Sequence, residues 1–154
     1  MNILIGADFV PTKSNIEYFE KGDIKHLLGE QLAELFSNAD YRIFNLEIPL
    51  TDKASPISKC GPNLIAHTSA VNGYKTAGID LLTLANNHIL DHGKQGLENT
   101  LNVLNDAGIN YVGVGKTREQ AAKPFVFECD NKKIGVYACA EHEFSVVTDS
   151  SAGA

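Results

Sequence analysis

Residues 79–97, which read IDLLTLANNHILDHGKQGL, decide the fold that the sequence predicts. The stretch opens with an apolar run at 81–85 that is typical of a buried strand in a parallel sheet. Five polar or ionisable residues follow it, at the place where open α/β sheets bind ligands: Asn86, Asn87, His88, Asp91 and His92. Any one of them alone would be explained by a polar turn, but a turn does not need all five. We therefore expect a functional site directly beyond this strand.

The remaining chain alternates between predicted strands and predicted helices. Further strands are indicated at residues 2–7, 41–47 and 110–114. Helices are indicated at 25–36, at 97–107, at about 118–122, and between Thr68 and Gly78. Strands 125–129 and 133–140 form a predicted hairpin that turns at Asp130-Asn131 without a glycine. This order predicts an α/β fold, with a mainly parallel sheet and flanking helices.

Two of the predicted helices have apolar residues at the spacing of one buried face. In the first helix these residues are Leu28, Leu32, Leu35 and Phe36. In the second they are Leu97, Leu101, Leu104 and Ala107. Gly108 follows the second helix directly and is expected to end it. We expect both faces to pack against the sheet.

The composition limits the class of protein. A chain of 154 residues fits one domain, and 44% hydrophobic with 21% charged residues is ordinary for a globular protein. The formal net charge of −6 offers no broad cationic face, so no nucleic-acid partner is expected. The apolar runs are far too short to span a membrane, and residues 1–8 lack the pattern of a signal peptide. The sequence as written is therefore expected to be cytoplasmic, and association with the cell envelope stays open.

The cysteines and the end of the chain each support one expectation. Cys60, Cys129 and Cys139 lack the spacing of a zinc site, so we expect free thiols, with Cys139 packed in a strand. Residues 148–154 contain small residues and no closing element. We therefore expect residues 1–154 to be the amino-terminal part of a single truncated domain. We expect this part to expose an apolar surface on which the missing carboxyl-terminal half would pack.

Polar side chains end three of the predicted strands. Asp8 ends the first strand, Asn45 and Glu47 end the second, and Asn87 follows the third. Because each stands at the carboxyl end of its strand, Asp8, Glu47 and Asn87 are expected to converge at one edge of the sheet. Carboxylate and amide oxygens suit hard or borderline cations, and a histidine can move a proton.

These segments together resemble a known family. Gly6-Ala7-Asp8, Asn45-Leu46-Glu47 with Pro49, and Ala85-Asn86-Asn87-His88 with Asp91 and Gly93 are similar to motifs of CapA-type poly-γ-glutamate capsule-synthesis proteins. These proteins are relatives of the calcineurin-like metallophosphoesterases. The resemblance extends over nearly the whole chain and implies the amino-terminal half of a four-layer αββα sandwich. Phosphoesterases usually carry a histidine two residues after the first aspartate, and Val10 stands at that position here.

The resemblance also implies roles for individual residues. Asp8, Glu47 and Asn87 would be metal ligands, His88 would lie beside the leaving group, and Asp91 would orient His88. The metal would be one or more divalent ions, for which the ligand types leave Mn, Fe, Zn and Mg open. Two cations clamped by shared carboxylates can activate a water and stabilise an in-line phosphoryl displacement, with a histidine donating a proton to the departing oxygen.

Further residues are candidates for substrate binding. Lys59, followed by Gly61-Pro62, could extend over the site from a loop, although an ordinary surface lysine has the same sequence signal. Glu141 and His142 follow the last predicted strand and could face the site.

Three functions are compatible with these features. The first is a metal-dependent phosphoesterase or hydrolase whose substrate is a polyanionic polymer or a phosphorylated small molecule. The second is a non-catalytic protein that binds polyglutamate chains through a cation during capsule assembly or export, together with capsule-synthesis machinery. The third is a structural α/β domain in which the polar loops have no function.

Overall fold

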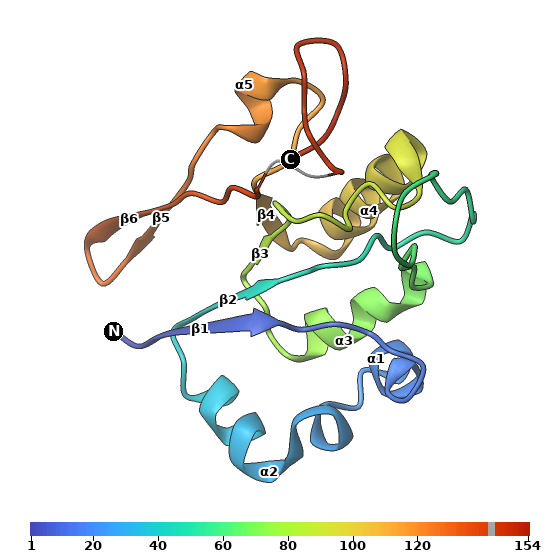
Figure 1. Cartoon of the computed structure of the whole chain (residues 1–154). Helices are drawn as coiled ribbons and strands as arrows, with labels where there is room; N and C mark the ends of the chain where they lie inside the picture. Colours follow the sequence, from blue (N-terminus) through green and yellow to red (C-terminus); the bar gives the residue numbers. More distant parts are fainter. Residues whose placement is uncertain (142–143) are drawn as a thin grey trace.

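The computed structural model describes residues 1–141 and 144–154 and has a parallel sheet at its centre (Figure 1). The four strands lie in the order β1-β2-β3-β4, and each is parallel to its neighbours. They are β1 (Ile3–Asp8), β2 (Tyr41–Asn45), β3 (Leu81–Thr83) and β4 (Asn110–Val112). Because all four strands run in one direction, their carboxyl ends share one edge of the sheet. The α/β prediction with a parallel sheet is confirmed.

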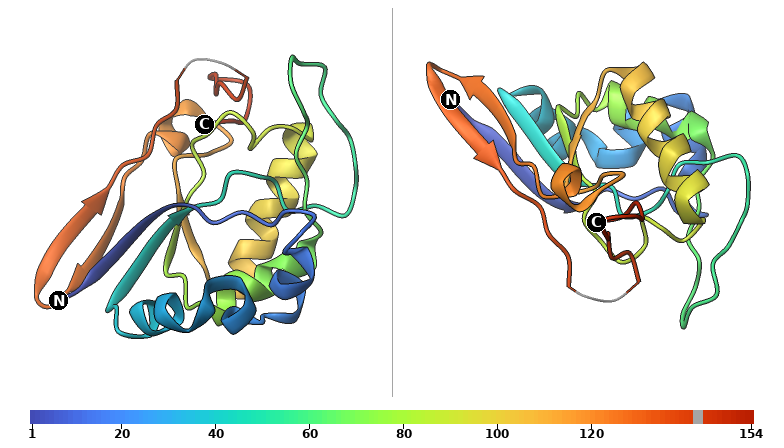
Figure 2. Two further views of the ribbon diagram at one scale, coloured as in Figure 1. Left: turned by 60° about the horizontal axis from the view of Figure 1, so that its bottom comes forward. Right: turned by 90° about the horizontal axis from the view of Figure 1, so that it is seen from above.

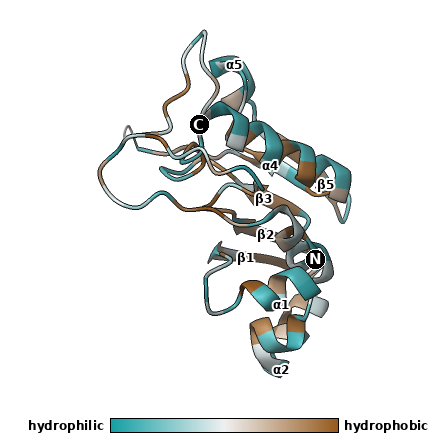
Figure 3. Cartoon of the chain, turned by 90° about the vertical axis from the view of Figure 1, so that its right-hand side faces the viewer, coloured by the Kyte–Doolittle hydropathy of each residue, from teal (hydrophilic) through white to brown (hydrophobic). Residues whose placement is uncertain are grey.

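Helices cover one face of this sheet (Figure 2). They are α1 (Ile16–Lys21), α2 (Ile24–Ser37), α3 (Val71–Thr76) and α4 (Gly93–Ala107), with a short 3₁₀ turn, η1 (Thr68–Ala70), before α3. The main hydrophobic core includes Leu82 and Leu84 from the sheet side and Phe19, Tyr74 and Leu104 from the helices. In Figure 3 the strand β3 is mostly hydrophobic, whereas α4 alternates between hydrophobic and hydrophilic residues.

A small antiparallel hairpin covers part of the other face (Figure 2). It consists of β5 (Phe125–Cys129) and β6 (Lys132–Val136) and follows the short helix α5 (Arg118–Ala121). Phe127 packs against Ile43, Leu81 and Val112 of the sheet. Its ring stacks on that of Tyr41, with 3.7 Å between the ring centroids and an angle of 7° between the planes.

The predicted hairpin is confirmed at its turn and shorter than expected at its end. Asp130 and Asn131 have positive φ values of 54° and 59°, as a two-residue hairpin turn requires, and these residue types tolerate that conformation. The second strand ends at Val136, which pairs with Phe125, the first residue of β5. Pro124 precedes β5 and has no N–H with which to extend the ladder. Cys139 is therefore exposed beyond the strand, and the expectation that it packs in a strand is wrong. All three cysteines are free, as predicted.

The expected buried face of α2 is wrong in part. Phe36 is buried, but Leu32 and Leu35 are 49% and 50% exposed. Gly29, with a φ of 70° and a ψ of 169°, interrupts the helix. The turns before and after Gly29 therefore do not share one continuous helical face, and the 3.6-residue spacing does not hold across the kink.

The helix after the central strand agrees with its prediction. Leu97 and Leu104 of α4 are buried, and Leu101 is partly buried against the same core. Gly108 ends the helix in a left-handed conformation with a φ of 72°, and its N–H donates to the carbonyls of Asn105 and Leu104. Among the residues that the structure describes, no helix combines the length and the apolar character needed to cross a membrane.

Candidate functional site

Side chains at the ends of β1, β2 and β3 form a hydrogen-bonded row along the carboxyl edge of the sheet. Asp8 is in register with Asn45, and Asn45 is in register with Thr83. Asn45 Nδ2 donates to Asp8 Oδ1 at 2.7 Å, and Thr83 Oγ1 donates to Asn45 Oδ1 at 3.1 Å. This row holds the Asp8 carboxylate at the edge of the sheet, where the sequence predicted it.

Asn86 connects the loop after β3 to the loop after β2. Its Nδ2 donates to the Leu46 carbonyl at 3.0 Å, and its Oδ1 accepts from the His88 N–H at 3.0 Å. Because Leu46 directly precedes Glu47, Asn86 fixes both the backbone beside Glu47 and the backbone of His88. His88 Nε2 consequently lies 4.0 Å from Glu47 Oε1.

The His88 ring is oriented by Asp91. Its Nδ1 lies 2.6 Å from Asp91 Oδ2. Because an ionised carboxylate only accepts hydrogen bonds, Nδ1 carries the proton of this contact. The opposite nitrogen, Nε2, therefore faces Glu47 and the strand ends. The structure brings His88 and Asp91 together, and the role of His88 as a proton donor stays a prediction.

Asp91 is a buried carboxylate that is paired with a cation and held by backbone hydrogen bonds. Its carboxylate pairs with the ammonium of Lys59 and accepts from the Leu64 N–H at 2.6 Å. Its carbonyl accepts from the Ile57 N–H at 3.0 Å. A carboxylate without partners would be costly to bury, so these contacts explain how the interior accommodates it. They also tie residues 57–64 to the site.

Lys59 lies under its loop and points toward the same centre. Its Nζ is 3.2 Å from His88 Nδ1 and 5.2 Å from the centre of the Phe144 ring, a distance at which a cation–π interaction forms. The side chain is thus enclosed by the site instead of extending into solvent. Its predicted role in substrate binding stays a prediction.

The other two predicted substrate-binding residues lie after β6. Glu141 is exposed and forms no hydrogen bond or ion pair within residues 1–141 and 144–154. His142 lies outside the described residues.

His92 has a structural position one residue beyond Asp91. It is buried, and its Nδ1 accepts from the Ser55 N–H at 2.8 Å. Burial lowers the pKa of His92, although the neighbouring Asp91 opposes this effect. The neutral ring of His92 thereby holds the loop at residues 52–63 at Ser55, in addition to the contacts that this loop makes with Asp91.

The predicted metal ligands fit a divalent cation by their chemistry. Asp8 ends β1, Glu47 and Asn87 stand on the loops after β2 and β3, and the three would supply two carboxylates and one amide oxygen. The side chains of Glu47 and Asn87 form no hydrogen bond within the described residues, which leaves their oxygens available. No group of three or more His, Cys, Asp and Glu side chains in this part of the chain has the arrangement of a metal centre. A metal centre at this edge would therefore need the Asn87 amide oxygen as a ligand beside the two carboxylates. The metal assignment stays a prediction.

Sequence reasoning missed the groups that hold this site in place. The Leu64 N–H on Asp91, the Ser55 N–H on His92 and the Thr83 hydroxyl on Asn45 are contacts between distant residues. A backbone N–H has no sequence signal, and Thr83 was indistinguishable from any other strand residue. Asn45 and Asn86, by contrast, were visible as polar residues at strand ends.

Comparison with known proteins identifies similar chains. A family model described as "Bacterial capsule synthesis protein PGA_cap" matches residues 3–153. The capsule biosynthesis protein CapA of Bacillus anthracis is 39% identical over 83 residues, which are 51% of this chain and 20% of CapA. A probable polyglutamine synthesis accessory protein of Mycobacterium tuberculosis is 37% identical over 94 residues, which are 56% of this chain and 23% of that protein.

A third relative covers more of the chain at lower identity. This relative, an uncharacterized protein of Sinorhizobium fredii, is 28% identical over 115 residues, which are 71% of this chain and 25% of that protein. The chain thus spans about a quarter or less of the length of each of these relatives.

Proposed function

Because the chain belongs to the PGA_cap family of bacterial capsule synthesis proteins, we propose that it acts in poly-γ-glutamate capsule synthesis through a metal-dependent, phosphoesterase-like hydrolytic site. The substrate would be a phosphorylated small molecule or a polyanionic polymer. The observation that carries this proposal is the orientation of His88, whose Nδ1 is held by buried Asp91 while Nε2 faces Glu47 at the sheet edge.

The proposed metal site uses the oxygens of Asp8, Glu47 and Asn87. A divalent cation bound there would supply a Lewis acid that lowers the pKa of a bound water and neutralises charge on a phosphoryl group. The row from Asp8 through Asn45 to Thr83 keeps the Asp8 carboxylate at the edge. Asn86 keeps the loop of Glu47 beside the loop of Asn87.

His88 would act on the leaving group. With Nδ1–H bonded to Asp91, a proton on Nε2 can pass to an oxygen that departs from the phosphoryl centre. Asp91 is a positioning residue, because it contacts His88 and would not contact the substrate. Lys59 pairs with Asp91, whose carboxylate in turn contacts and orients the His88 ring.

The experiment measures hydrolysis and binding on the same full-length protein. Phosphate release from a chromogenic phosphomonoester is measured with added Mn²⁺, Mg²⁺, Zn²⁺ or Fe²⁺ and with a chelator. Turnover that depends on the metal and is lost in Asp8→Ala would support the proposal. No metal-dependent turnover on phosphomonoesters or on a γ-linked polymer would contradict a hydrolase.

A second candidate function is metal-assisted polymer binding without catalysis. The name of the Mycobacterium tuberculosis relative, a probable polyglutamine synthesis accessory protein, supports this candidate. In this role the same cation would hold the carboxylates of polyglutamate chains during assembly or export, beside other capsule-synthesis proteins at the cell envelope. Saturable binding of poly-γ-glutamate that needs the metal but gives no turnover would favour this candidate over the hydrolase.

A further inference from the structure

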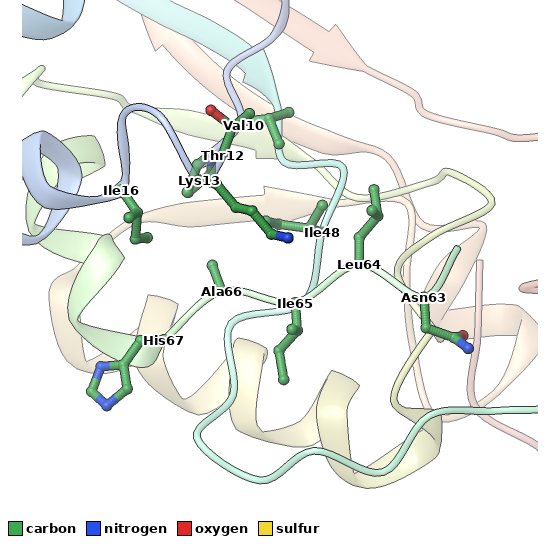
Figure 4. A pocket seen from close by; sticks show the side chains of 11 residues that line it. Val10, Thr12, Lys13, Ile16, Ile48, Asn63, Leu64, Ile65, Ala66 and His67 are labelled. Atoms are coloured by element: carbon green, nitrogen blue, oxygen red, sulfur yellow. The ribbon is translucent and has the colours of Figure 1, made fainter. Parts of the chain in front are cut away.

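Two pockets outside the candidate site differ in their chemistry. A pocket of about 430 Å³ between the loop after β1 and residues 63–67 has largely apolar walls, and Figure 4 shows the Lys13 side chain extending toward Ile48 there. A pocket of about 470 Å³, the β4 pocket, is lined by Leu101, residues 111–116 and part of the segment 120–125. Both volumes fall within the range of small-ligand sites. The β4 pocket combines apolar walls with two lysines, Lys116 and Lys123, and can therefore hold an anionic group together with an organic one.

The β4 pocket lies at an open edge of the sheet. β4 is the last strand in the order β1-β2-β3-β4, so its outer side pairs with no other strand of this sheet. Val112 faces β3, because its carbonyl accepts from the Leu84 N–H at 2.9 Å. Successive residues of a strand direct their peptide groups to opposite sides, so the N–H and carbonyl of Tyr111 face the outer edge. Tyr111 lines the pocket, and within residues 1–141 and 144–154 these peptide groups form no hydrogen bond.

The two lysines give this pocket a positive charge in a chain whose net charge is −6. Lys116 and Lys123 are exposed, and neither forms an ion pair in the part of the chain that the structure describes. No Asp or Glu of the described residues lines the pocket beside them. An ammonium is a compact point charge, and a phosphomonoester is largely a dianion at neutral pH. The two lysines therefore match the charge of one phosphomonoester group.

Gln120 adds a neutral donor beside the lysines. Its Oε1 accepts from the Lys116 N–H at 2.9 Å, and its Nε2 donates no hydrogen bond within the described residues. Both protons of Nε2 are therefore available to a ligand. Gly115 permits this arrangement, because a Cβ at that position would lie 2.5 Å from Gln120 Cβ. Gly115 also exchanges two hydrogen bonds of 3.0 Å with Gly153, so the loop that carries Lys116 is held in place from both sides.

The remaining walls of the β4 pocket are apolar and include aromatic rings. Leu101 comes from α4, Tyr111 from β4 and Phe125 from the start of β5. Hydrocarbon walls favour a ligand with an apolar part, because both surfaces leave water. Aromatic side chains also attract a ring of the ligand through stacked or edge-to-face contacts. The walls therefore suit an organic group that contains a ring.

We propose that the β4 pocket binds a small phosphomonoester that carries an aromatic or heterocyclic ring. The phosphate lies between Lys116 and Lys123 and accepts from Gln120 Nε2, and the ring lies against Leu101, Tyr111 and Phe125. This binding site is additional to the proposed hydrolytic site, whose residues follow β1, β2 and β3. It needs no metal, and it does not depend on the proposed function.

The test measures the binding of adenosine monophosphate (AMP) to the full-length protein by calorimetry. A chelator is present, so that no metal contributes to binding and no metal-dependent hydrolysis occurs. Inorganic phosphate and adenosine each supply one part of AMP, and each is expected to bind at least tenfold more weakly than AMP. Lys116→Met and Lys123→Met are each expected to weaken AMP binding about tenfold, because each removes one charge-assisted contact. Lys132→Met is the matched control, since Lys132 is an exposed lysine of β6 outside the pocket and the net charge changes equally.

Gln120→Glu tests the donor without removing the contact that holds the loop. The glutamate retains an oxygen for the Lys116 N–H, but it replaces the Nε2 donor with a second, negatively charged oxygen. AMP binding is expected to fall more than tenfold while the thermal midpoint stays unchanged. Unchanged affinity for AMP in this variant would overturn the proposal, because a carboxylate in the pocket must repel the phosphate.

A loss of AMP binding in the three pocket variants, with normal binding in Lys132→Met, would support the proposal. No AMP binding to the unmodified protein, or an equal loss in Lys132→Met, would overturn it. Adenosine or inorganic phosphate that binds as tightly as AMP would also overturn it, because one part of the ligand would then have no contacts. Asp8→Ala should bind AMP normally, and a loss there would place the ligand at the proposed metal site instead. Normal AMP binding by a protein without metal-dependent hydrolysis would support the β4 pocket while the proposed function fails.

Discussion

Lys59 and Asp91 form an ion pair in which both side chains are withdrawn from water, with exposed fractions of 2% and 0%. The pair joins the loop at 52–63 to the turn that follows β3. Asp91 also holds the His88 ring, so one buried carboxylate connects the loop, the ring and the backbone of Leu64. The stability of the loop and the geometry of the candidate site therefore depend on the same contact.

Lys59→Met is expected to lower the free energy of unfolding by about 3–5 kcal/mol, because it leaves the Asp91 carboxylate buried without its cation. Lys59→Arg retains the charge and should cost less. Urea denaturation followed by circular dichroism measures the difference.

Lys94→Met is the control for this prediction. Lys94 is an exposed lysine 3.9 Å from Glu98 on the surface of α4, and such pairs contribute little to stability. If Lys59→Met were no more destabilising than Lys94→Met, the Lys59–Asp91 pair would not stabilise the folded state.

Asn131→Val is expected to destabilise the hairpin by about 1–2 kcal/mol, because a β-branched side chain is strained at the left-handed φ of 59°. Asn131→Gly should be neutral or slightly stabilising, since glycine adopts this conformation without strain. Comparing the urea midpoints of the two variants tests the turn geometry. Equal midpoints would show that Asn131 does not need the left-handed conformation.

Stability should fall as the pH falls below the ordinary histidine pKa of 6.5, partly because of His92. Its pKa is lowered in the folded protein, so below 6.5 the unfolded chain binds a proton that the folded protein does not yet accept. The loss should level off below the lowered pKa, where both states are protonated. Unfolding free energies measured between about pH 7 and about pH 5.5 report this slope.

The variant for this test is His92→Asn. An asparagine can offer Oδ1 to the Ser55 N–H in place of Nδ1, and it does not titrate. The slope of stability against pH should therefore become shallower in His92→Asn. An unchanged slope would assign the pH dependence to other groups.

The sheet and the edge that carries the site could be predicted because they follow from local patterns. Apolar runs such as 81–85 indicate buried strands, and a parallel order places Asp8, Asn45 and Asn86 near one edge. The hairpin at Asp130-Asn131 was predictable for the same reason, since its turn chemistry is local.

Features that depend on three-dimensional context could not be predicted. Nothing in the spacing of Leu28, Leu32 and Leu35 showed that Gly29 would leave the helical conformation. The burial of Lys59 was equally hidden, because its loop lacks periodicity and its partner Asp91 lies in another segment. The pocket beside Lys13 forms only when the loop after β1 meets residues 63–67.

The central claim is that His88 donates a proton and does not hold the metal. His88→Ala should reduce metal-dependent turnover by a factor of roughly 10² to 10⁴. Its metal content should be nearly unchanged, because the proposed ligands are Asp8, Glu47 and Asn87. Asp8→Ala and Asn87→Ala should instead lose metal first, and activity should follow.

Metal analysis of purified His88→Ala and Asp8→Ala, loaded and washed side by side, tests this claim most directly. The account predicts near-normal metal in His88→Ala and a clear loss in Asp8→Ala. If His88→Ala loses its metal as fully as Asp8→Ala does, His88 is a ligand and the proposed division between proton donor and metal ligands is wrong.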